Sequence, residues 1–396
     1  MGKIRNKEII VIGTSTQNNK WVNGQSMMFQ LLVDEMQKKK FTPVIVDFGL
    51  SISKNSNNRR VSGNFSFIKV LDNIIVLLKF FKEILFHPNA PIYLNTSQTK
   101  VGFIRDYIMI NTASFFKRKI IAHQFGANYT RYYSEQSPRN KERIKSTLQK
   151  TYKVVVEGDY TKEQFSFLPN YQEKVISVPN GLPEKIDLSK IKAKEIIPGR
   201  TVKMLYLSNM IESKGFWDVL EAFRILVNIK KRDVAITFAG KFFGDTEDTK
   251  FQNPDNAHKA FLKFVDDHQL KSKFTYCADG LYGKEKSEAF LDANFFLLPS
   301  YYINEGQPAS VLEALAYGCV PITTKYRLIP MMVTEENGAF VNPKSPQEIA
   351  DTIERFILDP SRYHQHSAAA INDYYHKFTA EKYIEKLIQI LDSNEN

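Results

Sequence analysis

Apolar runs rich in β-branched residues alternate with amphipathic segments along almost the whole chain. Strands are expected in the first half at residues 9–13, 43–48, 91–95, 119–123, 153–157 and 174–178. Segments with apolar residues at helical spacing separate them, at 25–37, 67–85, 103–116, 139–151 and 162–167. Strands that alternate with helices in this way predict parallel sheets with crossover helices. The pattern therefore favours an α/β fold.

The second half of the chain repeats this rhythm, which predicts a second domain. Its expected strands are 203–207, 234–240, 273–277, 294–299, 320–323 and 339–341, and its expected helices are 215–227, 257–268, 285–291, 309–317 and 346–358. A polar and charged segment, 181–200, separates the halves and predicts a linker. We expect an N-terminal domain at 1–190 and a C-terminal domain at 200–377, since 396 residues exceed one ordinary core.

The charge is unevenly divided between the two halves. Residues 1–200 carry 32 Lys and Arg against 16 Asp and Glu, a net charge of +16, whereas residues 201–396 carry 22 against 27, a net charge of −5. This asymmetry predicts that the first domain faces an anionic partner, such as a membrane surface, a phosphate-bearing acceptor or nucleic acid. The alternative is a solvated basic surface without a specific partner.

Several classes of protein are disfavoured by the sequence. Only two cysteines occur, Cys277 and Cys319, which predicts neither a disulfide framework nor a cysteine metal site and fits a reducing cytoplasm. The start of the chain has a short apolar run without a cleavage pattern, so we expect a first strand rather than a signal peptide. The longest apolar stretch, 67–86, is interrupted by charges and should not span a membrane.

Two glutamates lie eight positions apart in the segment NEGQPASVLEALAYGCVPI, residues 304–322. A helix is expected to begin near Gln307 or Pro308, so Glu305 precedes a helix N-terminus, where free amides suit a phosphate. Glu313 follows about 12 Å further on at the helical rise, roughly the reach from the sugar to the ribose of a nucleotide sugar. In the alternative interpretation, Glu305 supports the helix N-terminus and Glu313 is a partly exposed helix residue.

A lysine and a glycine precede the first helix of the second domain. In the segment LYLSNMIESKGFWDVLEAF, residues 205–223, a strand ends in a short loop and Lys214 lies at the expected helix start. A cation at this end opposes the helix dipole, so a neutralising anion such as a diphosphate explains its placement. An ordinary surface lysine is the alternative.

Two further candidates lie in the first domain. Gly24 precedes a helix after the first strand, where a glycine permits close approach of the backbone to a phosphate or a sugar. His123 lies where a strand ends, and its imidazole could donate to a sugar hydroxyl or a phosphate. An ordinary loop and a structural histidine are the respective alternatives. The sequence contains neither GxGxxG nor a P-loop, and it has no HExxH, GxSxG or DxD motif.

Taken together, four segments resemble the retaining, GT-B-fold glycosyltransferases of family 4. They are Lys214 with Gly215, VPNG at 178–181, LLPS at 297–300, and EGQPASVLEALAYGCVPI at 305–322. The resemblance implies two Rossmann-like, doubly wound domains that face each other across a cleft. It also implies that the C-terminal helix, within 378–396, crosses back to the N-terminal, acceptor-binding domain.

The resemblance implies roles for individual residues of the donor domain. Glu305 would contact the donor sugar, Glu313 the ribose, and Lys214 the diphosphate. The backbone between the two glutamates would hold the phosphates or the sugar. The remaining donor-binding positions of this segment are Gly306, Gln307, Pro308 and Ala309.

In the first domain, His123 would lie near the donor hexose and Gly24 would belong to the glycine loop. The implied catalytic residues are thus Glu305, His123 and Lys214. One position departs from the family pattern: many members carry an arginine five residues before the lysine, where this chain has Asn209. Asn209 could only hydrogen-bond to a phosphate. Members of the family need no metal, in agreement with the missing DxD motif.

The resemblance therefore implies metal-independent, retaining transfer of a hexose from a nucleotide sugar, with UDP as the expected nucleotide and no other cofactor. The acceptor would be a saccharide or a lipid-linked saccharide in the assembly of cell-surface polysaccharide. We expect a cytoplasmic protein that binds no nucleic acid. Peripheral attachment to an anionic inner membrane face stays open, because segment 67–86 is either an interfacial helix or a cover for the core.

Two other functions stay open. A nucleotide-sugar 2-epimerase of the same fold would convert the donor without an acceptor. A non-enzymatic polyanion binder would explain the basic first half but not the paired glutamates, and its binding would depend steeply on salt.

Overall fold

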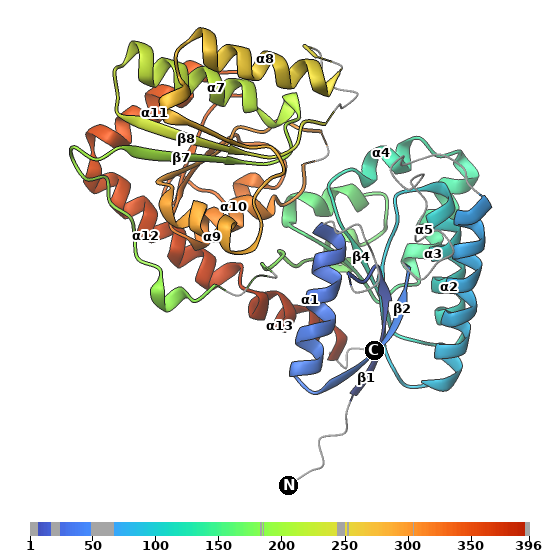
Figure 1. The fold of residues 1–396 in the computed structure, drawn as a ribbon. Coiled ribbons are helices and arrows are strands. Elements are labelled where there is room, and N and C mark those ends of the chain that lie inside the picture. Colours follow the sequence, from blue (N-terminus) through green and yellow to red (C-terminus); the bar gives the residue numbers. More distant parts are fainter. Residues whose placement is uncertain are drawn as a thin grey trace. The chain divides into compact units, whose positions relative to one another are not determined.

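The chain folds into two compact units. The computed structural model describes residues 7–16, 24–48, 67–182, 184, 186–243, 250–251, 253–303 and 305–392. Met1–Pro183 and Ala380–Asn396 make up the first unit, and Glu184–Thr379 make up the second. Each unit contains a six-stranded parallel sheet with helices on both faces (Figure 1). The α/β class expected from the sequence is confirmed.

The sheet of the first unit has the strand order β2-β1-β3-β4-β5-β6. Its strands are β1 (Lys7–Gly13), β2 (Phe41–Asp47), β3 (Ile92–Asn95), β4 (Ile120–Gln124), β5 (Lys153–Val156) and β6 (Val175–Ser177). Along β1, Ile10 and Ile12 face one hydrophobic core, whereas Ile9 and Val11 face another. Because both faces of the sheet are covered, its central strands carry consecutive buried apolar residues and do not alternate with polar residues.

Helices cover both faces of this sheet (Figure 1). One face is covered by α2 (Phe67–Phe86), α3 (Lys100–Phe115) and α5 (Pro138–Gln149), and the other by α1 (Gly24–Lys38) and α13 (Ala380–Asp392). Shorter helices are α4 (Tyr129–Ser134) and α6 (Tyr171–Lys174).

The expected α-helix at 162–167 is wrong. A 3-10 helix, Asp159–Phe165, occupies this place, and the Thr161 hydroxyl exchanges hydrogen bonds with the backbone of Gly158. These local side-chain bonds stabilise a tight turn at the start of the segment and compete with the α-helical pattern.

The C-terminal helix α13 belongs to the first unit, although it follows the second in sequence. Tyr383, Ile384 and Leu387 are buried in the same core as residues of α1 and β1. At the end of the helix, Asp392 forms an ion pair with Lys7 of β1, with 3.0 Å between the carboxylate and the ammonium nitrogen. A segment distant in sequence therefore completes the core of the first unit.

The second unit has the strand order β12-β11-β10-β7-β8-β9. Its strands are β7 (Val202–Leu207), β8 (Val234–Ala239), β9 (Phe274–Cys277), β10 (Phe295–Leu298), β11 (Val320–Thr323) and β12 (Ala339–Phe340). Its helices are α7 (Phe216–Arg224), α8 (Pro254–Asp267), α9 (Gly283–Asp292), α10 (Ala309–Ala316), α11 (Pro346–Leu358) and α12 (Pro360–Lys377). Figure 1 shows α7 and α8 on one side of the sheet and α9 and α10 on the other.

Residues 184–200, which the sequence suggests as part of a linker, belong to the second unit. The backbone amide of Lys194 donates to the hydroxyl of Ser367 on α12, at 2.8 Å. The Lys194 ammonium donates to the carbonyls of Phe290 and Ala293. Polar groups of this segment therefore form hydrogen bonds with the rest of the second unit.

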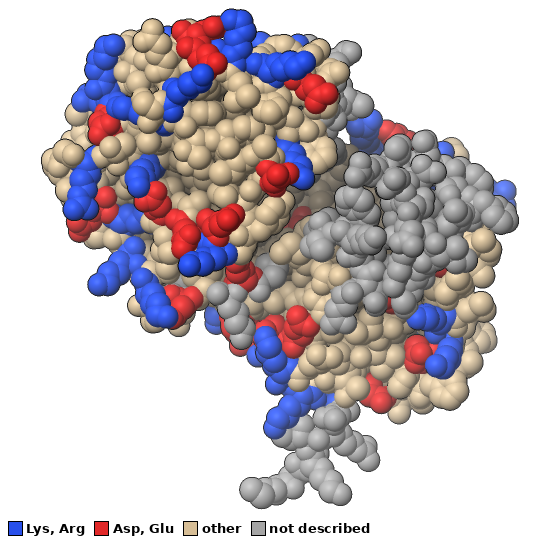
Figure 2. Space-filling model, viewed as in Figure 1, with Lys and Arg blue, Asp and Glu red and all other residues tan. Residues whose placement is uncertain are grey.

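Opposite charges are mixed on the surface of the second unit. On the face that Figure 2 shows, Lys and Arg lie among Asp and Glu. Ion pairs also occur in this unit, such as that between Lys203 and Asp292. Within the described ranges, no helix has both the length and the apolar character needed to cross a bilayer.

The core position of α13 leads to a stability prediction. Leu387→Ala should lower the free energy of unfolding of the first unit by about 2 to 5 kcal/mol, because a fully buried leucine is removed from its core. Urea denaturation followed by circular dichroism measures this change. Lys386→Ala is the matched control on the exposed side of the same helix, and an equal effect of both substitutions would contradict the assignment.

Candidate functional site

The candidate site of the second unit begins where two neighbouring strands end. β7 and β10 pair side by side in parallel, so the segments that follow them emerge at the same edge of the sheet. Ligands of doubly wound folds bind at this carboxyl edge. The backbone amide of Tyr301, after β10, donates to the carbonyl of Ser213, after β7, at 2.8 Å. The two connections are therefore held together.

Gly215 permits this close approach. Its φ of +81° lies in the left-handed region, and a Cβ atom built there would lie 2.7 Å from both Cγ and the carbonyl oxygen of Pro299. Any other residue would therefore meet both backbone strain and a steric clash. The glycine that follows Lys214 in the sequence brings the start of α7 against the end of β10.

This contact places Lys214 beside Glu305. The Lys214 ammonium lies 3.4 Å from Oε1 of Glu305 and 5.3 Å from the ring centroid of Tyr302. The other carboxylate oxygen, Oε2, accepts a hydrogen bond from the Ser300 hydroxyl. Glu305 is buried, with 4% of its surface exposed. Two residues that the sequence predicts as catalytic therefore meet as a largely buried ion pair.

Glu313 lies on α10 and forms a second buried pair. Its Oε1 accepts from the ammonium of Lys286 on α9, at 2.5 Å, and Lys286 also contacts the carboxylate of Glu184, at 2.8 Å. The interpretation of Glu313 as a partly exposed helix residue is wrong, since α10 is buried on every side from Val311 to Ala316. A helix without a solvent face has no ordinary surface position for a carboxylate.

Burial and charge oppose each other in each member of this second pair, and the pKa of both groups is raised overall. Burial raises the pKa of Glu313, although the positive charge of Lys286 opposes the rise. For Lys286, burial lowers the pKa, but the charges of Glu313 and Glu184 outweigh it, and the pKa is raised overall. The Lys286 ammonium therefore keeps its proton at neutral pH.

The segment between the two glutamates contains the N-terminus of α10. The helix begins at Ala309, as the expected helix at 309–317 does, and Pro308 is its N-cap in an extended conformation. The expected distance of about 12 Å between Glu305 and Glu313 assumed a helix that starts at Glu305. This distance does not apply, because residues 305–308 precede the helix. The first amides of α10 have no intrahelical acceptor and can bind an anion.

Asn209 lies in the turn between β7 and α7. Its side chain is exposed. Its backbone carbonyl accepts from the amide of Ile211, at 2.9 Å, and from the hydroxyl of Tyr206, at 3.4 Å.

His123 lies in the first unit at the end of β4, and its side chain is fully buried. Its Nδ1 lies 2.6 Å from the Tyr93 hydroxyl, and its ring stacks on that of Phe125 with centroids 4.1 Å apart. The ring of Tyr383, on α13, also lies near that of His123, with centroids 6.4 Å apart. Burial lowers the pKa of His123 to about 3. The imidazole is therefore neutral at physiological pH.

Gly24 is the first residue of α1 and is exposed. A Cβ atom built there would meet no other atom within 4 Å. No steric reason for a glycine is present in the described part of the chain. The rest of the predicted glycine loop, residues 17–23, lies outside the described residues.

Sequence reasoning missed several residues that surround the two glutamates. These are Glu184, Lys286, Ser300 and Tyr302. Lys286 could have been suspected from its position in the first turn of α9, where a lysine opposes the helix dipole as Lys214 does. Nothing local marks the others. Within the described ranges, no group of three or more His, Cys, Asp and Glu side chains is arranged to hold a metal ion.

Comparison with protein families finds one similarity, which lies in the second unit. Residues 187–373 match the model of glycosyl transferases group 1, and this range lies within Glu184–Thr379. The matched range contains both buried ion pairs apart from Glu184. No curated protein matches the chain at a significant level.

Solved structures similar to this chain include three with nearly complete coverage. A glycosyltransferase from Rickettsia africae ESF-5 is 15% identical, with a TM-score of 0.68 over 98% of this chain and 100% of that one. Sucrose-phosphate synthase from Thermosynechococcus elongatus is 15% identical, with a TM-score of 0.67 over 97% and 98%. Anabaena HepE in complex with UDP is 12% identical, with a TM-score of 0.65 over 97% and 99%. The fold is GT-B, with two Rossmann-like domains, as the resemblance implies.

The buried state of His123 gives a prediction on pH. Because its pKa of about 3 lies below the usual 6.5, the unfolded chain gains a proton first as the pH falls. The contribution of the neutral His123 side chain to the free energy of unfolding is therefore complete above pH 6.5. It is lost as the pH falls toward 3, by up to about 1.4 kcal/mol per pH unit. The His123→Phe variant should lack this slope in its free energy of unfolding.

The same histidine can be followed directly by NMR. Its ring carbon resonance, assigned by its loss in the His123→Phe variant, should keep the shift of a neutral imidazole from pH 5 to pH 8. A titration midpoint between these values would contradict the buried state.

Proposed function

We propose that this protein is a retaining glycosyltransferase of family 4 that transfers a hexose from UDP-hexose to a saccharide or a lipid-linked saccharide. The observation that carries the proposal is the contact between Lys214 and Glu305 at the carboxyl edge of the second sheet. A cation for a diphosphate and a carboxylate for sugar hydroxyls are there held side by side. The group 1 domain at residues 187–373 supports glycosyl transfer as the reaction type.

Solved structures of the same fold support UDP as the nucleotide of the donor. HepE from Anabaena is known in complex with UDP, with UDP and glucose, and with UDP-glucose. In this chain, Glu313 is the residue to accept hydrogen bonds from the ribose hydroxyls. The positive charge of its partner Lys286 opposes the rise in the pKa of Glu313 that burial causes, and the contact fixes the orientation of the carboxylate.

The chemical step breaks the bond between the anomeric carbon and the oxygen of the β-phosphate. Negative charge then develops on the leaving UDP, and Lys214 with the first amides of α10 stabilises it. The acceptor hydroxyl forms the new bond on the same face of the sugar, and its proton passes to the leaving phosphate oxygen. This route retains the anomeric configuration without a covalent enzyme intermediate. Glu305 orients the sugar through its hydroxyls.

His123 cannot act as a charged acid at neutral pH, because the pKa of its buried imidazole is about 3. In this proposal it acts as a neutral hydrogen-bonding group whose orientation is set by the Tyr93 hydroxyl. The reaction requires no metal, a proposal that the missing DxD motif supports. Addition of EDTA should therefore leave the rate unchanged.

The acceptor and the cellular role form the remaining part of the proposal. The net charge of +16 on residues 1–200 suits a phosphate-bearing, lipid-linked saccharide on a cytoplasmic membrane face. Assembly of cell-surface polysaccharide consumes such acceptors.

Removal of the Lys214 charge should abolish most turnover. Lys214→Met is expected to lower kcat by about 10²- to 10³-fold, equivalent to about 2 to 4 kcal/mol of lost stabilisation of the leaving diphosphate. Release of UDP in the presence of donor and acceptor measures the rate. Lys284→Met, at an exposed position of α9, is the matched control. Unchanged turnover of Lys214→Met would refute the assigned role.

Donor binding can be tested before the acceptor is known. A thermal-shift panel of UDP-, GDP- and ADP-sugars should show stabilisation by UDP-sugars, and Glu313→Gln should weaken it by about tenfold in Kd through loss of the charged ribose contact. Glu288→Gln, on the exposed surface of α9, should bind as the wild type does. A shift with another nucleotide would correct the donor.

The same experiment separates the alternatives. Absence of any shift, together with salt-dependent binding of nucleic acid that survives Glu305→Ala, would favour a polyanion binder. An epimerised sugar nucleotide in an incubation with donor alone would instead identify a 2-epimerase. A transferase gives neither result.

A further inference from the structure

One side of α2 is apolar and exposed. Val76, Phe80 and Ile84 face the core of the first unit. On the opposite side, Leu78, Leu85 and Phe86 expose 64%, 62% and 72% of their surface. A surface helix of a globular protein normally carries polar residues on its outer side. The inner side of α2 therefore accounts for the fold, and its outer side requires another explanation.

Helix α3 extends this surface. It packs beside α2 on the same face of the sheet (Figure 1). Phe115 at its end is 82% exposed, and its ring meets that of Phe116 edge to face, with centroids 5.3 Å apart. We define the outer apolar face by the exposed apolar residues of both helices and the residue after α3. They are Leu71, Ile74, Leu78, Phe81, Leu85, Phe86, Ile104, Tyr107, Phe115 and Phe116.

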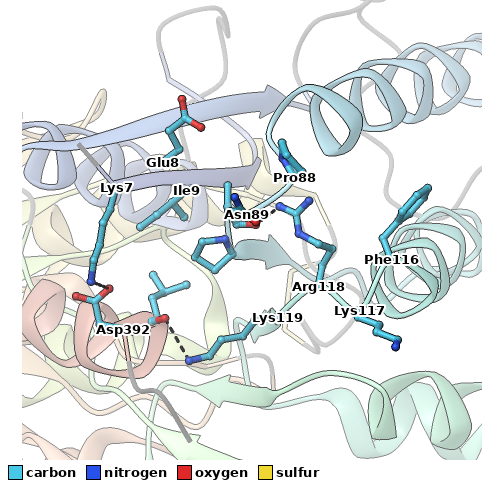
Figure 3. Close-up of a pocket in the computed structure, with 13 residues that line it drawn as sticks. Lys7, Glu8, Ile9, Pro88, Asn89, Phe116, Lys117, Arg118, Lys119 and Asp392 are labelled. Atoms are coloured by element: carbon cyan, nitrogen blue, oxygen red, sulfur yellow. Dashed lines mark hydrogen bonds and ion pairs between the residues drawn. The ribbon is translucent and has the colours of Figure 1, made fainter. Parts of the chain in front are cut away.

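A basic hollow lies at one end of the outer apolar face. It has a volume of about 830 Å³, and its lining includes Phe116, the basic residues Lys7, Lys117, Arg118 and Lys119, and the acids Glu8 and Asp392. Figure 3 shows Phe116 and Lys117 on the side of Arg118 away from Lys7. Arg118 donates to carbonyls at the end of α2 and beyond, including that of His87 at 2.6 Å. Lys117 is exposed at the edge of the apolar face.

The charged residues beside the outer apolar face are mostly positive. The adjacent helix α5, which contacts α3, carries four basic residues and one acid: Arg139, Lys141, Arg143, Lys145 and Glu142. The acids Asp72 and Asp106 on α2 and α3 are buried. Glu83, the other acid of α2, lies beside Lys82 and His87. The apolar surface is therefore bordered by exposed cations without a comparable number of exposed acids.

We propose that the outer apolar face docks on an anionic lipid bilayer. The apolar side chains of α2 and α3 enter the boundary between headgroups and acyl chains, while Lys82, Lys117 and the cations of α5 lie at the level of the lipid phosphates. This arrangement combines apolar burial with electrostatic attraction, as interfacial helices do. The inference rests on the surface of the first unit alone and does not depend on the proposed donor chemistry.

A second copy of the chain suits this surface less well than a bilayer does. In a twofold dimer, the same patch of each subunit faces the other. The interface would then contain the bordering cations of both subunits without a comparable number of exposed acids, and an excess of like charge in an interface opposes association. An anionic bilayer supplies both the apolar phase and the opposite charge.

Vesicle flotation of the full chain tests the proposal. The protein should float with vesicles of phosphatidylcholine and phosphatidylglycerol, and much less with phosphatidylcholine alone or at high salt. The double variant Leu78→Gln and Leu85→Gln should lower the partition coefficient at least about tenfold, because two inserted leucines are lost. Both positions are exposed, so the fold should be unaffected. Circular dichroism checks this point.

The matched control removes two exposed leucines from the second unit. Leu262→Gln with Leu358→Gln replaces side chains that are 40% and 65% exposed, and it should float as the wild type does. Arg139→Gln with Arg143→Gln should reduce binding to the anionic vesicles only.

Three results would overturn the proposal. The first is a wild type that does not bind anionic vesicles, and the second is binding unchanged by the Leu78 and Leu85 substitutions. The third is a dimer, seen by light scattering, that these substitutions dissociate while vesicles stay unbound. This last result would assign the face to a second copy of the chain. None of these measurements uses transferase activity, so failure of the proposed function would be seen separately.

Discussion

The close contact between Gly215 and Pro299 determines the geometry of the candidate site in the second unit. Because residue 215 has no side chain, the start of α7 can approach the end of β10 within van der Waals distance. The hydrogen bond from Tyr301 to Ser213 fixes the same contact from the other direction. Lys214, the residue before this glycine, is thereby held beside Glu305. The site depends on backbone packing between two strands before any side chain contributes to it.

The two buried ion pairs are difficult to explain by stability alone. Removing two charges from water is costly, and their attraction often fails to repay this cost. The second unit nevertheless buries Glu305 with Lys214 and Glu313 with Lys286, both beside the segment that leads into α10. A ligand with a diphosphate and several hydroxyls needs such charged groups in fixed positions, which gives the cost a functional reason.

Helix α2 is apolar on two sides, and its sequence leaves two interpretations open. The sequence leaves segment 67–86 as either an interfacial helix or a cover for the core. In the structure, its inner side covers the core through Val76, Phe80 and Ile84, while its outer side is also apolar. Because both sides of the helix carry apolar residues, the sequence does not show which of them face the core. Only the position of the sheet distinguishes them.

The sequence by itself determined the local elements and the main residues of the candidate site. Periodicity depends on neighbours within a few residues, so the strands of both sheets and most helices follow from it, as does the motif that contains Glu305 and Glu313. The tertiary structure decided which distant groups meet. It paired Lys286 with Glu313, buried His123 against Tyr93, and placed α13 in the core of the first unit. Burial and ionic contact depend on packing between segments far apart in the chain, which no local pattern records.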